Sequence, residues 1–201
     1  MNTRIQVFAK APQPGQAKTR LIPALGASGA AALARRMLGH TLAQALAAGI
    51  GPVELCASPD TAHRDWLGVP LPAGIGCSAQ GDGDLGARLS RASQRALQTA
   101  TAVLLIGTDC PALDASALRE AALQLARHDA VLIPATDGGY CLLGFKQHHA
   151  SLFEAMPWST AVVAQETLAR CAALRWRVWQ GAPLPDIDEP ADLAALPGDW
   201  Q

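Results

Sequence analysis

The stretch Ala102-Val-Leu-Leu-Ile106, followed by Gly107-Thr-Asp-Cys-Pro111, decides the fold class of this chain. Five consecutive apolar residues are typical of a strand that is buried on both faces of a mostly parallel sheet. The Gly and Pro residues that follow end the strand, so that Asp109 lies directly beyond its carboxyl end. We therefore expect a sheet covered by helices on both sides, with polar side chains along one edge.

Similar strand patterns alternate with helical ones along the rest of the chain. Further strands are predicted at Ile5–Ala9, Pro52–Ala57, Ile75–Ala79, Ala130–Pro134, Tyr140–Phe145 and Arg175–Trp179. Helices are predicted from a Ser28 cap to Gly49, over Ala87–Gln98, after an Asp114 cap, from Ser159 or Thr160, and from Pro190. This alternation predicts an α/β sandwich with a largely parallel sheet, formed by one domain that spans residues 1–201.

Composition excludes several classes of protein. Half of the residues (50%) are hydrophobic and 16% are charged, which is typical of a globular chain. The 16 Lys and Arg against 17 Asp and Glu give a formal charge of −1, so no global positive field favours nucleic acid as a partner. The five cysteines are scattered without a CxxC pair, and no export signal or membrane-length apolar run is present. We expect buried, reduced thiols and a cytoplasmic protein; a homodimer remains open.

Four polar clusters follow predicted strands, at residues 10–20, 80–88, 108–111 and 186–192. Ligands of open α/β sheets bind beyond the carboxyl ends of the strands, and we therefore expect these clusters to converge. In the first cluster Lys10, Lys18 and Arg20 surround a backbone opened by Pro14 and Gly15, which suits a diphosphate. A merely solvated loop is the alternative, because the loop has neither P-loop nor GxGxxG spacing.

Two aspartates are candidate ligands of Mg²⁺ or Mn²⁺, which bind through one or two carboxylates together with substrate phosphates. Asp109 lies beyond the buried strand, and Asp188 lies near the end of the chain. Each also has a structural alternative: Asp109 as an Asx turn before Pro111, and Asp188 as a helix cap.

The segment Asp137-Gly138-Gly139 predicts a hairpin turn and hence an antiparallel pair of strands. Alternatively, its missing side chains admit a sugar or another acceptor, with Asp137 accepting a hydroxyl proton.

An ordered set of motifs resembles the bacterial DUF2064 family, which is grouped with the GT-A nucleotide-diphospho-sugar transferases. The motifs are Phe8–Leu21, Gln80–Arg88, Ile106–Pro111, Pro134–Tyr140, Pro157–Thr160 and Asp186–Leu193. The resemblance implies a three-layer α/β/α fold with a mixed, mostly parallel sheet. One departure is a single carboxylate at Asp109-Cys110-Pro111, where many GT-A enzymes carry Asp-x-Asp.

The same resemblance implies roles for individual residues. Asp109 would hold a divalent ion, with Asp188 as a second ligand, and Lys10, Lys18 and Arg20 would contact phosphates. Residues near the nucleoside would be Gln80, Asp84, Gly86 and Arg88. Residues near the transferred group or the acceptor would be Asp137, Gly138, Gly139, Tyr140, Trp158, Ser159 and Thr160.

Three functions are compatible with these residues. The first is transfer of a sugar from a nucleotide-diphosphate sugar to an unknown acceptor, with Lys18 and Arg20 stabilising the departing diphosphate and Asp137 as the base of an inverting enzyme. The second is nucleotidyl transfer with release of pyrophosphate, since the Lys18-Thr-Arg-Leu21 loop and Asp186-Ile-Asp188 are similar to guanylyltransferases. The third is a non-catalytic domain that binds a nucleotide.

Overall fold

The computed structural model describes residues 2–200, whose strands form a single seven-stranded sheet in the order β3-β2-β1-β4-β6-β5-β7. The strands are β1 (Thr3–Lys10), β2 (Val53–Ser58), β3 (Ile75–Ala79), β4 (Ala102–Ile106), β5 (Ala130–Pro134), β6 (Tyr140–Phe145) and β7 (Val178–Gln180). Strand β6 runs antiparallel to β4 and β5, whereas the other neighbours are parallel. The sheet is therefore mixed and mostly parallel, as predicted.

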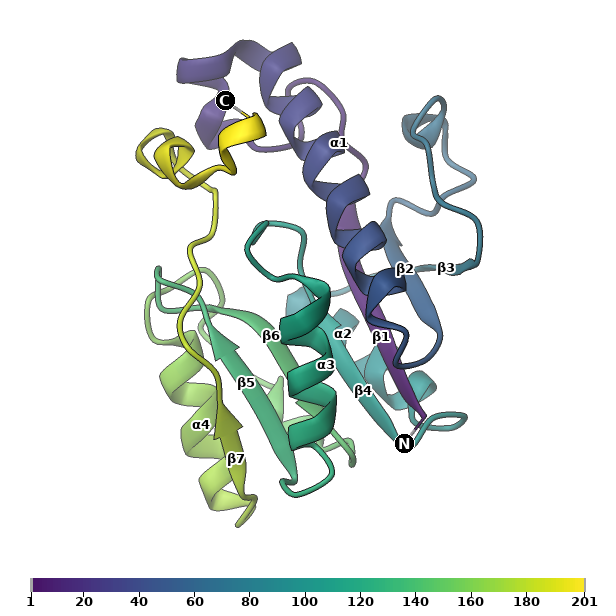
Figure 1. Ribbon diagram of the computed structural model, residues 1–201, viewed down its shortest axis with the longest axis vertical. Helices are drawn as coiled ribbons and strands as arrows, with labels where there is room; N and C mark the ends of the chain where they lie inside the picture. The colour runs from purple at the N-terminus through teal and green to yellow at the C-terminus, as the bar shows by residue number, and fades with distance from the viewer. Residues whose placement is uncertain (1, 201) are drawn as a thin grey trace.

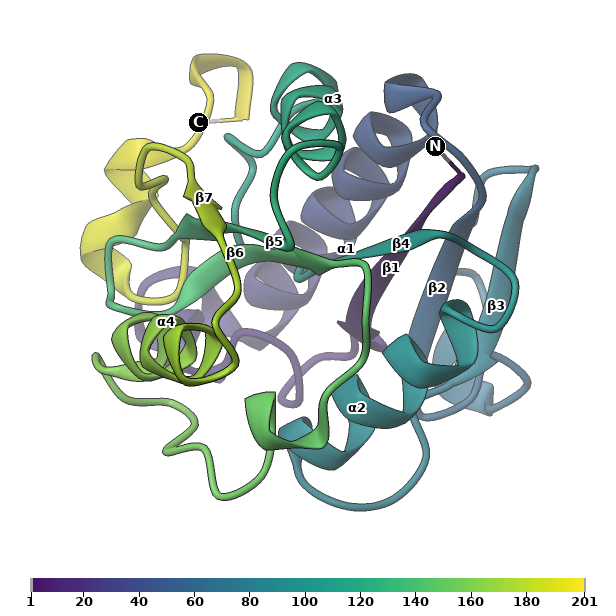
Figure 2. The ribbon, with the colours of Figure 1, turned by 90° about the horizontal axis from the view of Figure 1, so that it is seen from below.

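Four α-helices cover the two faces of this sheet: α1 (Ile22–Ala48), α2 (Leu85–Ala96), α3 (Ala115–Gln124) and α4 (Val163–Ala173). Figure 2 shows α1 and α3 on one face and α2 and α4 on the other. Short 3-10 turns are η1 (Thr19–Leu21), η2 (Arg64–Trp66), η3 (Ala150–Leu152), η4 (Pro190–Ala195) and η5 (Gly198–Trp200). The three-layer α/β/α architecture is confirmed. Within residues 2–200, no helix is both long enough and apolar enough to traverse a lipid bilayer.

Strand β4 is buried along its whole length, as its apolar run predicts. Leu104 and Ile106 pack in the core cluster that contains residues of α1 and α3. Val103 and Leu105 pack in the cluster that contains residues of α2 and α4. Because successive side chains of a strand point to opposite faces, only an uninterrupted apolar run can serve both layers.

A buried carboxylate, Glu54 of β2, forms a polar network beneath α2. It accepts hydrogen bonds from Gln6 (2.9 Å), Ser78 (2.7 Å) and Arg95 (2.6 Å), and its Oε2 lies 3.5 Å from Arg4. Burial raises the pKa of this carboxyl, but the hydrogen bonds and the charge of Arg95 outweigh burial and leave the pKa below its ordinary value. The hydrogen bonds and the charge of Arg95 thus compensate the cost of burying the Glu54 carboxylate.

Several elements differ from the sequence predictions in their bounds or type: β7 begins at Val178 rather than at Arg175, and α2 spans Leu85–Ala96 rather than Ala87–Gln98. The first helix begins at Ile22 rather than at Ser28, with a break at Gly26, whose φ is 69°. Helix α4 begins at Val163, and neither Ser159 nor Thr160 caps it, because the Thr160 hydroxyl donates to the Pro157 carbonyl instead. The segment from Pro190 forms 3-10 turns rather than an α-helix.

The last segment of the chain returns to the carboxyl edge of the sheet and lies beside the first turns of α1 (Figure 1). Ile187 is fully buried there, in a cluster with Leu21, Ala30 and Met37. This packing brings the end of the chain next to the loop that follows β1.

Candidate functional site

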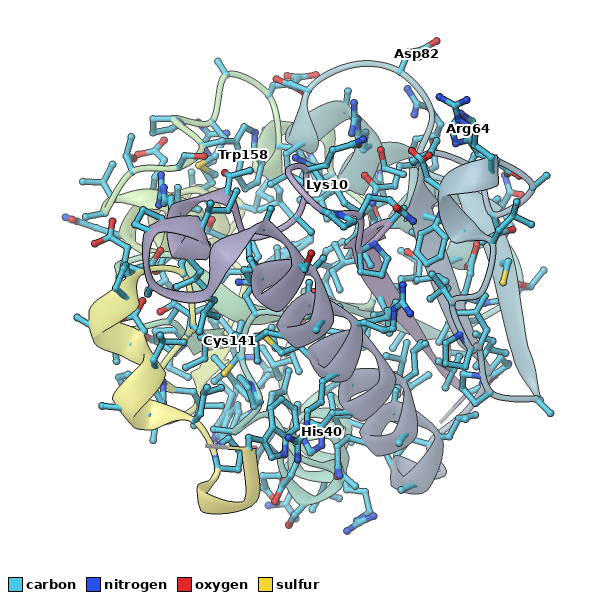
Figure 3. All side chains as sticks on the ribbon, turned by 90° about the horizontal axis from the view of Figure 1, so that it is seen from above. Lys10, His40, Arg64, Asp82, Cys141 and Trp158 are labelled. Atoms are coloured by element: carbon cyan, nitrogen blue, oxygen red, sulfur yellow. The ribbon has the colours of Figure 1, made fainter. Side chains whose placement is uncertain are left out.

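A cavity of about 600 Å³ lies at the carboxyl edge of the sheet, where β1 and β4 end. Figure 3 is drawn looking towards this edge, and Lys10 is labelled there. All four polar clusters of the sequence contribute to the lining. The predicted site residues among the lining are Lys10, Lys18, Arg20, Gln80, Asp84, Arg88, Asp109, Ser159 and Asp188.

Lys18 stands at the centre of the charges in this cavity, hereafter the cationic cavity. Its Nζ lies 2.7 Å from Oδ1 of Asp109 and 3.6 Å from Oδ1 of Asp188, and it donates to the carbonyl of Ile187. Only 7% of the Lys18 side chain is exposed, and its backbone has a left-handed φ of 48°. A left-handed conformation is uncommon for a residue other than glycine, and the Lys18 side chain is anchored by these three contacts.

Arg20 completes the charge cluster from the next turn of the chain. Its NH1 lies 2.6 Å from Oδ2 of Asp188. Asp188 does not cap the final segment, contrary to one of the two sequence readings: the N-cap is Glu189, and the capping carboxylate is that of Asp192. The Asp188 carboxylate is therefore held by two cations that lie far from it in sequence.

Backbone contacts fix the terminal segment against β4. The N–H of Ile187 donates to the carbonyl of Asp109 at 2.8 Å. Because Ile187 points into the core, the residues on either side of it, Asp186 and Asp188, are left on the cavity side of the segment. One buried apolar residue thus places two carboxylates at the edge of the sheet.

Gln80, Asp84 and Arg88 shape the far wall of the cationic cavity. Gln80 is buried and donates to the carbonyls of Ala9 (3.2 Å) and Cys56 (2.9 Å). Arg88 donates to the Gln80 side chain (3.4 Å), and Asp84 caps α2 by accepting the N–H of Ala87 (2.8 Å). These contacts join the ends of β1 and β2 to the start of α2.

Three residues predicted to contact the nucleotide lie outside the lining of this cavity: Pro14, Gly15 and Gly86. Gly86 is buried, and a Cβ there would collide with the Phe153 carbonyl and the Trp158 indole nitrogen. Gly86 therefore permits close packing of α2, which is a different role from ligand contact.

A second cavity, of about 300 Å³, adjoins the first and shares with it Phe8, Leu85, Gly107, Asp109 and Ser159. Most of the predicted acceptor residues line it: Asp137, Gly139, Tyr140, Trp158, Ser159 and Thr160. The remaining one, Gly138, has a φ of 92° and lies against the Ala161 backbone, so that it serves the turn itself.

Three carboxylates, Asp109, Asp137 and Asp186, line this second cavity, hereafter the acceptor cavity. Oδ1 of Asp137 accepts the N–H of Gly139 at 2.7 Å, as in the predicted turn. Burial, and then the nearby charge of Asp137, raise the pKa of Asp186. Sequence reasoning missed Asp186 as a lining residue, although it stands two positions before Asp188 in the same polar cluster.

Two cysteine thiols lie in the wall of the acceptor cavity. Cys110 and Cys141 are both buried, and a hydrogen bond between their thiols lowers the pKa of Cys110 and raises that of Cys141. The expectation that every cysteine is buried is wrong for Cys77, which is exposed on the edge strand β3.

The carboxylates of Asp109 and Asp188 can hold a divalent ion only together with the phosphate oxygens of a bound substrate. Among residues 2–200, no group of three or more His, Cys, Asp or Glu side chains is arranged to hold a metal. Asp109 and Asp188 nevertheless approach the same Lys18 ammonium, and one or two carboxylates plus phosphate oxygens are the usual ligands of Mg²⁺. The residues therefore fit a metal that arrives with a phosphorylated substrate.

Fold and site define a three-layer α/β/α protein with a cation-lined cavity at the carboxyl edge of its sheet. The family model described as "Uncharacterized protein conserved in bacteria (DUF2064)" matches residues 41–160, and the chain belongs to this family. No curated protein is significantly similar to it.

Solved structures share the fold. One from Desulfovibrio desulfuricans G20, provisionally named a nucleotide-diphospho-sugar transferase, is 32% identical with a TM-score of 0.87, over 96% of this chain and 85% of the other. Rv0371c from Mycobacterium tuberculosis H37Rv, in complex with manganese, is 18% identical (TM-score 0.64; 98% of both chains). A CMP:2-keto-3-deoxy-manno-octonic acid synthetase with bound CTP is 12% identical (TM-score 0.61; 97% and 96%). The last two support the fold alone.

Proposed function

We propose that this protein is a transferase that moves a glycosyl group from a nucleotide-diphosphate sugar to a hydroxyl acceptor. The observation that carries the proposal is the ion-pair cluster of Lys18, Arg20, Asp109 and Asp188, which lines a cavity of about 600 Å³ that adjoins a second one. The likeness to the provisionally named transferase of Desulfovibrio, at 32% identity, supports the same class.

The cationic cavity would hold the diphosphate. Lys10, Lys18, Arg20 and Arg88 line it, and their charges match the two phosphates of a nucleoside diphosphate. In the free protein Lys18 and Arg20 bind carboxylates. We propose that they exchange these partners for phosphate oxygens, so that their charge is directed at the leaving group when the glycosidic bond breaks.

The proposed metal ligands are Asp109 and Asp188. Bound there, Mg²⁺ or Mn²⁺ would neutralise charge that develops on the departing diphosphate. The manganese complex of the Mycobacterium fold relative is consistent with a divalent ion in this fold.

The acceptor would bind next to Asp109 in the acceptor cavity. Its hydroxyl oxygen attacks the anomeric carbon, the bond from that carbon to the diphosphate oxygen breaks, and the nucleoside diphosphate leaves with the electron pair. In an inverting reaction a carboxylate takes the hydroxyl proton. Asp137 is the proposed base: its Oδ1 is engaged by the turn, and the second oxygen accepts no hydrogen bond from the residues that the structure describes.

Nucleotidyl transfer is the second candidate, and the observation in its favour is the shared fold with a synthetase that binds CTP. The two reactions differ in their leaving groups. Incubation with nucleotide sugars that releases a nucleoside diphosphate supports glycosyl transfer, whereas pyrophosphate released from a nucleoside triphosphate supports nucleotidyl transfer.

Thermal unfolding in a panel of nucleotides and nucleotide sugars, with and without Mn²⁺, tests the proposal. A ligand at one hundred times its Kd stabilises the fold by about 2.7 kcal/mol, which raises the Tm of a chain this long by about 5 to 10 °C. The part of the Tm increase that depends on Mn²⁺ should vanish in the variant Asp109→Asn. It should persist in Asp114→Asn, because Asp114 caps a helix and lies outside both cavities. If no nucleotide raises the Tm under any condition, the proposal is wrong.

A further inference from the structure

The acceptor cavity differs from the cationic cavity in the sign of its charge. Of its lining residues, three carry a carboxylate, Asp109, Asp137 and Asp186, and within the described chain no Lys, Arg or His side chain lines it. The cationic cavity has four cations, Lys10, Lys18, Arg20 and Arg88. An anionic group is therefore stabilised in the cationic cavity and repelled in the acceptor cavity.

The negative charge of the acceptor cavity has little internal compensation. Asp137 is bound by the N–H of its own turn, and Asp186 by the Thr136 hydroxyl at 3.4 Å. Both partners are neutral donors. Only Asp109 has a cationic partner, Lys18, and that ammonium lines the other cavity.

Apolar side chains make up most of the remaining wall. Phe8 and Leu105 come from the sheet, Leu89 and Val163 come from helices, and Trp158 comes from the segment before α4. A surface of this kind binds an apolar or aromatic face of a ligand, with a few polar groups that fix its orientation.

Two buried donors belong to the same wall. The Tyr140 hydroxyl and the Trp158 indole N–H have no hydrogen-bond partner among residues 2–200, and the two rings meet edge to face with centroids 6.5 Å apart. Both polar atoms are buried beneath the cavity surface, and the indole nitrogen faces Gly86, so the two rings offer a ligand their apolar parts. At about 300 Å³ the cavity has room for one small molecule.

We infer that the acceptor is a small molecule without phosphate or carboxylate, neutral or cationic, that presents an apolar or aromatic face beside its hydroxyl group. The inference rests on the proposed function, because it assigns the adjoining cavity to the donor nucleotide. It narrows the acceptors to aryl or alkyl alcohols, glycosides and amino alcohols, and it excludes sugar phosphates and hydroxy acids.

The test uses the indole ¹H–¹⁵N signal of Trp158 in the full-length protein, identified among the five tryptophans by its loss in Trp158→Phe. The probes are phenyl β-glucoside, its 6-phosphate and its 6-amino derivative, together with matched sets of aryl alcohols, benzylamines, aryl phosphates and aryl carboxylates. A nucleoside diphosphate with Mn²⁺ is titrated in parallel. Its binding reports on the cationic cavity, so that failure of the proposed function is recognised separately.

Neutral and cationic probes should shift the Trp158 signal, and the 6-phosphate should bind about tenfold more weakly than its parent glucoside. In the variant Asp137→Asn/Asp186→Asn this difference should disappear. Both substitutions preserve hydrogen-bond acceptors, so that the turn at Gly139 and the contact with Thr136 remain. Phosphorylated probes that bind as tightly as neutral ones overturn the inference, and so does a signal that no probe shifts.

Discussion

Replacing Lys18 by Met should increase the affinity of the free protein for Mn²⁺ while weakening its affinity for a nucleoside diphosphate. In the free protein the Lys18 ammonium contacts Asp109 and Asp188, the two proposed metal ligands. A dication and an ammonium about 5 Å apart repel by about 1.7 kcal/mol even in the dielectric of bulk water. Removing that repulsion should strengthen Mn²⁺ binding by about 15-fold.

The diphosphate should respond in the opposite direction. A hydrogen bond to a charged group contributes about 1.5–3 kcal/mol, so losing the Lys18 contact should weaken diphosphate binding by about 10- to 100-fold. Free Mn²⁺ measured by electron paramagnetic resonance gives the first affinity, and calorimetric titration gives the second. Lys146→Met changes the net charge equally, and Lys146 lines neither cavity, so that both affinities should be unchanged in this control.

Loss of stability must be separated from loss of binding. Removing one member of a buried ion pair costs about 3–5 kcal/mol when its partner stays buried. Here the side chains of Asp109 and Asp188 are 55% and 39% exposed and can be rehydrated, so we expect about 1–2 kcal/mol, or about 2–8 °C in Tm. A folded Lys18→Met protein that binds Mn²⁺ no more tightly than the wild type would refute the assignment of the two carboxylates.

Three further predictions concern the fold around the site. Glu54→Gln should lower the free energy of unfolding by about 1–3 kcal/mol at neutral pH, as urea titrations can measure. Because the pKa of Glu54 is lowered in the folded protein, the difference between variant and wild type should shrink as the pH falls below the ordinary carboxyl range. Gly86→Ala should cost about 1–3 kcal/mol by overpacking α2, whereas Gly39→Ala, where a Cβ meets nothing within 4 Å, should be neutral or stabilising in the same denaturation assay. Iodoacetamide should alkylate the exposed Cys77 at least about tenfold faster than the four buried cysteines, as peptide mass spectrometry can measure; equal rates would contradict the burial.

Local patterns predicted four of the seven strands with their exact bounds. The ranges predicted for β3, β4, β5 and β6 coincide with the observed strands. Each of these runs has a Gly or Asp directly beside it or two positions away on at least one side, so the strand and at least one of its ends are encoded locally. The cap of α3 at Asp114 is local in the same sense, because its carboxylate bonds an N–H three residues on.

Structural features that depend on contacts between residues far apart in the sequence were predicted less well. Ser159 has the composition of a helix cap, but its backbone adopts a φ of 62°, and α4 begins four residues later. Whether Asp188 caps a turn or pairs with a cation depends on Lys18 and Arg20, which lie 170 and 168 residues away in the sequence. No local pattern carries that information, since the burial of Ile187 against α1 brings these residues together.

The near-neutral charge of the whole chain conceals a local separation that matters for binding. Two carboxylates of the cationic cavity, Asp109 and Asp188, already have cationic partners, so the free protein does not bear the cost of leaving these partly buried charges unpaired. Arrival of a metal with its phosphates would then exchange partners: cations move to phosphate oxygens, and carboxylates to the metal. Such an exchange leaves none of these four side chains without a partner of opposite charge, so the cost of an unpaired buried charge does not oppose binding. The acceptor cavity, lined by carboxylates without cations, cannot make this exchange with an anion, and the two adjoining cavities therefore select ligands of different charge.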